Sequence, residues 1–142
     1  LVVVTPPAHP LGARSSLHFA AILDEELVSL LDGAVTQEFL RQQALRLHRE
    51  LKVRVQVAGF EAIFRMVEAG VAIAVVPEVL VQRMNERGTV NVCQLEDEWA
   101  YREYQLCARS FSALPLYARE FIETVERHAR TLQRDRSTGS NL

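Results

Sequence analysis

The chain has 142 residues, 49% of them apolar and 24% charged, and its formal net charge is −2 at pH 7. This composition fits one soluble globular domain and excludes a wholly disordered chain and a disulfide-stabilised scaffold, and no apolar run is long enough to span a membrane. Without an excess of positive charge, nucleic-acid binding by this chain itself is not expected. We expect a soluble, cytoplasmic protein.

The chain opens with an expected strand. Leu1–Val4 is a continuous apolar and largely β-branched run, which is typical of a strand that is buried on both faces. Prolines at positions 6, 7 and 10 indicate a stiff connection that leaves this strand. A strand at the first residue, with no initiator methionine, suggests that the sequence begins inside a longer protein.

Strands and helices then alternate. Apolar runs and alternating valines predict strands over residues 27–31, 52–57 and 71–76, and apolar stripes at helical spacing predict helices over 35–51, 60–69 and 77–87. Gly70 is expected to cap the second helix in the left-handed conformation. Strands at 90–92 and 104–108 and a helix at 115–132 should follow, before a disordered tail over 133–142. This order predicts an α/β fold, with a mostly parallel sheet and helices on both faces.

The sequence contains no recognisable catalytic motif. The four histidines have no metal-ligand spacing, and Cys93 and Cys107 lack a CxxC partner and are expected to be small buried residues of a reducing cytoplasm. The acidic runs at 24–26 and 96–98 either hold a hard cation or are solvated loop tips, and the second interpretation is favoured. We therefore expect no catalytic residue, no metal site, no cofactor and no enzymatic activity.

One feature suggests ligand binding. In parallel sheets, ligands bind beyond the carboxyl ends of the strands, where backbone N–H groups of helix N-termini point outward. The sequence has three such strand–helix junctions, and the first, Leu31–Thr36, combines a flexible glycine with free donors suited to a carboxylate. Asp32 leaves an alternative open, because its carboxylate would cap the helix and repel an anion, and the junction would then be an ordinary turn.

Several segments, taken in order, resemble the effector-binding domain of LysR-type transcriptional regulators. They are the opening Leu1–Val4 with His9–Leu11, the strand and turn from Leu27, the stretch Val53–Pro77 and the final helix around residues 118–122. Each is a plain strand–turn–helix pattern, so their order and spacing together carry the resemblance, which extends to about His128.

The resemblance implies a fold and a function. The family's effector domain has two α/β subdomains, arranged as in periplasmic solute-binding proteins, with a small and often anionic metabolite in the cleft between them. An N-terminal winged helix-turn-helix, which this sequence lacks, binds DNA, and the regulators form homo-oligomers. By this resemblance the chain senses an effector for a DNA-binding transcriptional regulator. A fragment of a periplasmic-type solute-binding protein is the alternative, and a small α/β enzyme is a more remote one.

The resemblance also implies a division of the chain and a set of ligand-binding residues. Residues 1–7 correspond to the end of the first subdomain and the hinge, 8–103 to the second subdomain, and 104–132 to a return strand and the terminal helix. The implied cleft residues lie at the hinge, at the turn after the first strand of the second subdomain and at the start of the next helix: Thr5, Pro6, Leu31, Asp32, Gly33, Ala34, Phe60 and Glu61.

The sequence departs from the family pattern in two places. The family's usual Gly-x-Gly reads Gly70-Val71-Ala72, so a close backbone approach at Ala72 is not expected, and His48 stands where the family commonly has glycine. Because most of the first subdomain is absent, apolar surface would be left uncovered, and we expect self-association through the Leu1–Thr5 edge or the final helix.

Overall fold

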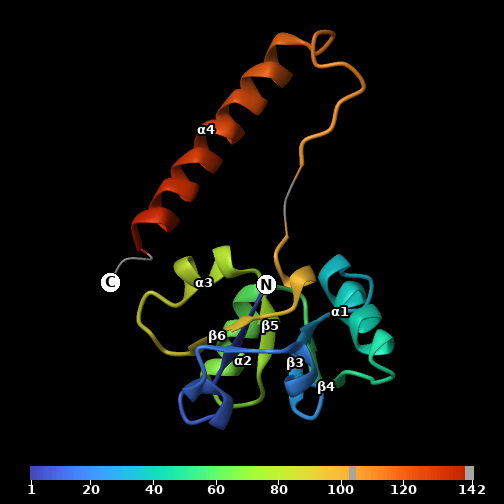
Figure 1. The fold of residues 1–142 in the computed structure, drawn as a ribbon, viewed down its shortest axis with the longest axis vertical. Coiled ribbons are helices and arrows are strands. Elements are labelled where there is room, and N and C mark those ends of the chain that lie inside the picture. The colour runs from blue at the N-terminus through green and yellow to red at the C-terminus, as the bar shows by residue number, and fades with distance from the viewer. Residues whose placement is uncertain (103–104, 140–142) are drawn as a thin grey trace. The chain divides into compact units, whose positions relative to one another are not determined.

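The computed structural model describes residues 1–102 and 105–139, and the chain divides into two compact units, Leu1–Arg102 and Glu103–Leu142. The second unit contains helix α4 (Leu116–Gly139), and the first unit contains the other elements of Figure 1. Its helices are α1 (Val35–Arg46), α2 (Phe60–Glu68) and α3 (Glu78–Met84). Its strands are β1 (Val2–Thr5), β2 (Ser16–Leu17), β3 (Glu26–Leu30), β4 (Lys52–Val57), β5 (Ala74–Val76) and β6 (Asn91–Leu95).

Strand β1 lies inside the sheet and runs against its neighbours. It pairs antiparallel with β5 and β6, and β2 pairs parallel with β6. The parallel pair β3–β4 joins β5 through a parallel bridge between Leu27 and Ile73. A four-stranded sheet thus has the order β2-β6-β1-β5, the two-stranded sheet β3-β4 continues it beside β5 through this bridge, and β1 points opposite to the other five strands. The predicted α/β fold with a mostly parallel sheet is confirmed, with β1 as the exception.

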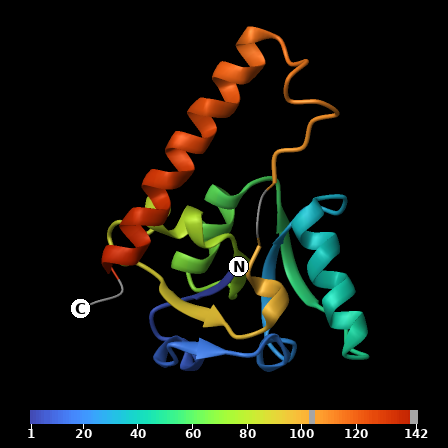
Figure 2. The same cartoon turned by 45° about the horizontal axis from the view of Figure 1, so that its top comes forward.

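The side chains of β1 explain why the opening run is continuously apolar. Val3 belongs to a core with Leu40 of α1 on one face of the sheet, whereas Val4 belongs to a second core with Ile63 and Val67 of α2 on the other face. Figure 2 shows α1 and α2 on opposite sides of the sheet. The prediction of helices on both faces is confirmed, and burial of both strand faces contributes hydrophobic stabilisation.

One expectation for the first residues is wrong. Leu1–Thr5 is not an edge available for self-association, because β5 and β6 occupy both sides of β1. Strand β1 lies fully buried in the sheet of the first unit, and the assignment of residues 1–7 to the end of another subdomain and a hinge stays a prediction. A strand that is apolar on both faces needs such neighbours to cover it and to satisfy its backbone.

The second unit departs from the expected return strand and tail. Residues 105–108 form no strand, and Tyr104 lies outside the described residues. A strand needs a neighbour for its hydrogen bonds, and within the described part of this unit the chain offers only α4. Residues 133–139 are expected from the sequence to be disordered, but helix α4 continues through them. Adding residues to a formed helix costs little. Within the described residues, no helix is both long and apolar enough to cross a membrane.

The two cysteines have different environments. Cys93 of β6 is buried as predicted, its thiol donates to the carbonyl of Leu11 at 3.1 Å, and burial raises its pKa. Cys107 is exposed, so the expectation that it is buried is wrong. Its segment is not in a strand and has no sheet face to bury it.

The acidic runs are engaged by neighbouring side chains and backbone. Asp24 is paired with Arg49 and Lys52, and Glu26 with Arg54 at 2.7 Å. Asp97 accepts a hydrogen bond from the backbone N–H of Phe19 at 2.6 Å. These contacts tie surface loops to the sheet.

His48 ends α1 in a conformation that favours glycine. Its φ is +56°, and it follows the helix C-terminus, where a left-handed residue commonly closes the last turn. We expect His48→Gly to raise the free energy of unfolding by roughly 1 kcal/mol, because the left-handed conformation is strained for a residue with a Cβ. Chemical denaturation measures this gain. His48→Ala, which keeps the Cβ, should show no gain, and equal effects of the two changes would contradict the strain argument.

Glu68, at the end of α2, should make stability depend on pH. The Thr89 hydroxyl donates to the Glu68 carboxylate, and this bond is the largest of the effects that lower the pKa of Glu68 from its usual 4.5. Burial acts in the opposite direction, whereas Arg65, with Nη1 3.1 Å from Glu68 Oε2, and the charge of Arg87 lower the pKa further. The unfolded chain then binds the proton more readily, so the stabilisation is present above pH 4.5 and is lost as the pH falls through the lowered value. Acid titration of the unfolding free energy should show a flatter profile in Thr89→Val and in Glu68→Gln, and an unchanged slope in both would refute it.

Candidate functional site

The topology of the sheet locates a candidate ligand site between β3 and β5. The chain leaves β3 through α1 toward β4, at one edge of the sheet, and leaves β5 through α3 toward β6, beyond β1. Adjacent parallel strands whose connections depart in opposite directions form a topological switch point, and ligands bind outside the carboxyl ends of such strands. The candidate site is therefore the end of the sheet where β3, β4 and β5 terminate.

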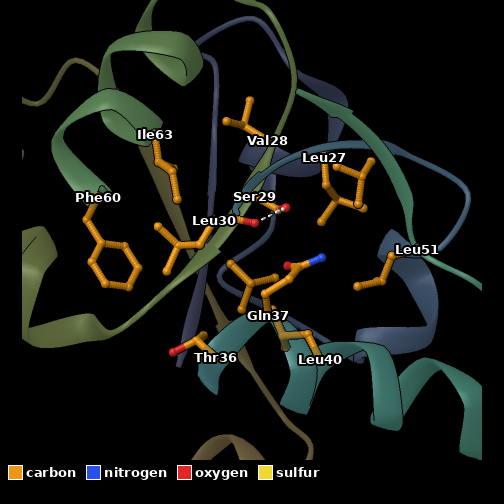
Figure 3. Close-up of a pocket in the computed structure, with 12 residues that line it drawn as sticks. Leu27, Val28, Ser29, Leu30, Thr36, Gln37, Leu40, Leu51, Phe60 and Ile63 are labelled. Atoms are coloured by element: carbon orange, nitrogen blue, oxygen red, sulfur yellow. Dashed lines mark hydrogen bonds between the residues drawn. The ribbon is translucent and has the colours of Figure 1, made fainter. Parts of the chain in front are cut away.

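A narrow cavity of about 10 Å³ lies at this switch point. Figure 3 shows it between β3 and the first turn of α1, with Phe60 and Ile63 of α2 also lining it. Val75 of β5 completes the wall on the side of the four-stranded sheet. This volume is about that of one water-sized group, so a metabolite would have to lie outside it, along the sheet end.

The turn before α1 presents backbone donors at this end. Gly33 has φ +89°, the Ala34 N–H donates back to the Leu31 carbonyl at 3.2 Å, and the first intrahelical bond runs from Glu38 to Ala34 at 3.0 Å. The amide N–H groups of residues 35–37 consequently have no backbone acceptor in the described chain. Helix α2 begins at the same end of the sheet, because it follows the parallel strand β4. The junction thus offers partial positive charge for an anion.

Asp32 does not cap α1. The cap residue is Ala34, with no side-chain capping bond, and the Asp32 carboxylate instead accepts from Arg41 at 2.7 Å and from Gln56 at 3.0 Å. The alternative that Asp32 is an N-cap is therefore wrong. Because Arg41 partly neutralises its charge, Asp32 opposes an anion at the α1 N-terminus less than the sequence suggested.

The structure brings together most of the residues that were predicted to bind a ligand. Leu31, Asp32, Gly33 and Ala34 form the turn between β3 and α1, and Phe60 lines the cavity beside them. Glu61 is the neighbour of Phe60 in α2 but lines a separate hollow of about 790 Å³ between α2 and α3. It therefore faces away from the switch point.

Thr5 and Pro6 do not share this site. Strand β1 is antiparallel to β5, with Val2 opposite Val76 and Val4 opposite Ala74, so Thr5 lies at the sheet end where β5 begins. Thr5 is also fully buried. The structure therefore does not bring these two residues together with Leu31–Ala34, and their part in ligand binding stays a prediction.

Two polar residues of the cavity were missed from the sequence. Ser29 of β3 and Gln37 of α1 are both buried there. A signal existed for Gln37, since it stands three and seven residues before Leu40 and Ala44 and therefore on the buried stripe of α1. Val35, the apolar residue that opens α1, is exposed.

Comparison with known proteins identifies the family. The family model described as the LysR substrate binding domain matches residues 1–130. The chain belongs to this family. No curated protein matches the chain in sequence.

Solved LysR-family structures have a similar fold. The regulatory domain of Synechocystis PCC6803 CcmR, in complex with 2-PG, has a TM-score of 0.67 at 19% identity over 87% of this chain and 59% of that one. The effector-binding domain of QuiR in complex with shikimate has a TM-score of 0.61 at 18% identity, over 68% of this chain and 44% of that one. The BenM effector-binding domain with its effector benzoate has a TM-score of 0.60 at 19% identity, over 70% of this chain and 46% of that one. The chain thus spans about half of each, and at these identities the likeness shows the fold.

Proposed function

We propose that this chain is part of the effector-sensing domain of a LysR-type regulator and that it binds a small anionic metabolite to modulate transcription. The observation that carries the proposal is the α1 N-terminus at the switch point. Its backbone N–H donors have no backbone acceptors in the described chain, and the nearby carboxylate of Asp32 is already paired with Arg41. Such a site binds and discriminates between ligands without catalytic groups. The proposal therefore includes no enzymatic activity and no cofactor.

Leu31–Ala34 and Phe60 are the residues that we propose to contact the effector. Two relatives of similar fold are described with small carboxylic acids, shikimate and benzoate, which fits the chemistry of this junction. A panel of small carboxylates beginning with these two, titrated by calorimetry, tests the proposal. A panel in which neutral analogues bind as well as the acids would contradict it.

The remaining wall of the binding cleft would come from another part of a longer polypeptide. The support is that this chain spans 44–59% of the three relatives described above and that α4 exposes large apolar side chains. Leu116, Tyr117 and Phe121 are 72%, 74% and 63% exposed, which is unusual for a helix in a complete fold. We propose that this helix packs on the other half of the effector domain and that the regulator is a cytoplasmic homo-oligomer.

The gene sequence upstream of Leu1 distinguishes the proposal from its alternative. A winged helix-turn-helix followed by a second α/β half would support a DNA-binding regulator. A secretory signal followed by another binding lobe would instead support a periplasmic-type solute-binding protein and would overturn the regulatory function.

A further inference from the structure

A buried amide at the switch-point cavity has no acceptor among the residues that the structure describes. Gln37 is 3% exposed, and its Nε2 finds no hydrogen-bond partner among the described residues. In Figure 3 its side chain projects from α1 between Ser29 and the side chains of Leu27, Leu40 and Leu51. A donor in such apolar surroundings is strongly disfavoured unless an acceptor reaches it.

The orphan donor is specific to this position. Gln43, six residues further along α1, is also buried, at 5% exposure. Its Oε1 lies 3.4 Å from Arg46 Nη1, and its Nε2 is not among the described buried donors that lack a partner. Burial of glutamine on this helix therefore does not by itself produce an unmet donor. Gln37, unlike Gln43, lines the switch-point cavity.

The cavity has the size and the second polar group that one oxygen atom needs. Its volume of about 10 Å³ matches the smallest space that holds a water molecule. Ser29, 8% exposed, donates through Oγ to the Leu30 carbonyl at 2.9 Å, and its hydroxyl lone pairs can still accept a hydrogen bond. A donor, an acceptor and a matching volume thus line one small space.

We propose that this cavity binds a single hydroxyl-type oxygen, which accepts a hydrogen bond from Gln37 Nε2 and donates one to Ser29 Oγ. Its source is either a water molecule or the hydroxyl of a bound solute. The water source is independent of the proposed effector function, whereas the solute source rests on it. Either way, Gln37 links the first turn of α1, where the backbone donors lie, to the middle of β3.

Nuclear magnetic resonance of the ligand-free, full 142-residue chain tests the water source. We expect a direct cross-peak between water and the side-chain amide protons of Gln37, assigned by its loss in Gln37→Met and its retention in Gln43→Met. Fluorescence of Trp99, the single tryptophan, checks that both variants fold. If Gln37→Met fails to fold, Ser29→Ala takes its place, and the cross-peak should weaken because the oxygen loses its second partner.

Native mass spectrometry of the purified chain tests the solute source. A bound small molecule that is retained by the wild type and Gln43→Met but lost from Gln37→Met would support the proposal without a water cross-peak. The absence of both the cross-peak and a Gln37-dependent bound mass would overturn it. Neither result depends on the upstream gene sequence, so this proposal and the regulatory function fail separately.

Discussion

Val35→Pro should weaken the binding of an anionic effector about 10- to 100-fold while leaving the fold intact. Val35 is the first residue of α1, and proline there removes one outward N–H donor. A hydrogen bond to a charged group is worth roughly 1.5–3 kcal/mol, which corresponds to this loss in affinity. Calorimetry on the full-length protein, with the carboxylate that binds best, measures the effect.

The backbone around Val35 accommodates proline. The preceding Ala34 has φ −68° and ψ 129°, the extended conformation that a residue before proline adopts, and the Val35 side chain is 77% exposed. The melting temperature should therefore stay close to that of the wild type. Val35→Ala is the matched control, because it removes the side chain and keeps the N–H group. Equal affinities in the two variants would exclude α1 as the anion-binding element.

Gly12→Ala should destabilise the first unit by about 2–3 kcal/mol, the upper part of the range for overpacking a tight site. A Cβ on Gly12 would overlap the Asn91 side-chain amide and would stand 2.9 Å from the hydroxyl oxygen of the fully buried Thr5. Asn91 cannot turn away freely, because its Nδ2 donates to the carbonyls of Pro6 and Pro7 at 3.3 and 3.1 Å. Denaturant unfolding followed by circular dichroism measures the loss.

A double-mutant cycle with Asn91→Ala tests this cause. If the clash with the amide dominates, Gly12→Ala should cost much less in the Asn91→Ala background, because the overlapping atoms are gone. The contact with Thr5 should leave a smaller residual cost. Strict additivity of the two changes would show that the side chains do not interact and that the glycine is needed for another reason.

Much of the local structure could be predicted because local patterns determine it. The alternating valines of β4, the apolar spacing of α2 and the left-handed Gly70 with φ +76° all appear as expected. The positions next to those patterns that we propose to contact a ligand, such as Gly33 and Phe60, could be placed at the switch point for the same reason. They stand at the ends of elements whose limits the sequence marks with small or turn-forming residues.

The direction of β1 and the position of Thr5 could not be predicted in this way. A strand that is buried on both faces has the same composition whether it runs parallel or antiparallel to its neighbours, and direction depends on pairing with the distant β5 and β6. The role of Asp32 was missed for a related reason. Its partners Arg41 and Gln56 lie on two other elements, and nothing in the local sequence predicts that pairing.

The thin attachment between β3 and β5 has a consequence for amide hydrogen exchange. In the described chain, these strands share the bridge at Leu27 and Ile73, with backbone bonds of 2.8 and 3.3 Å at its two sides, whereas β1 is paired along its length with both neighbours. Segments with few cross-links open as separate cooperative units. The amides of β3, β4 and α1 should therefore exchange sooner than those of β1. An effector bound at the switch point should slow this exchange by holding these three elements against the rest of the sheet.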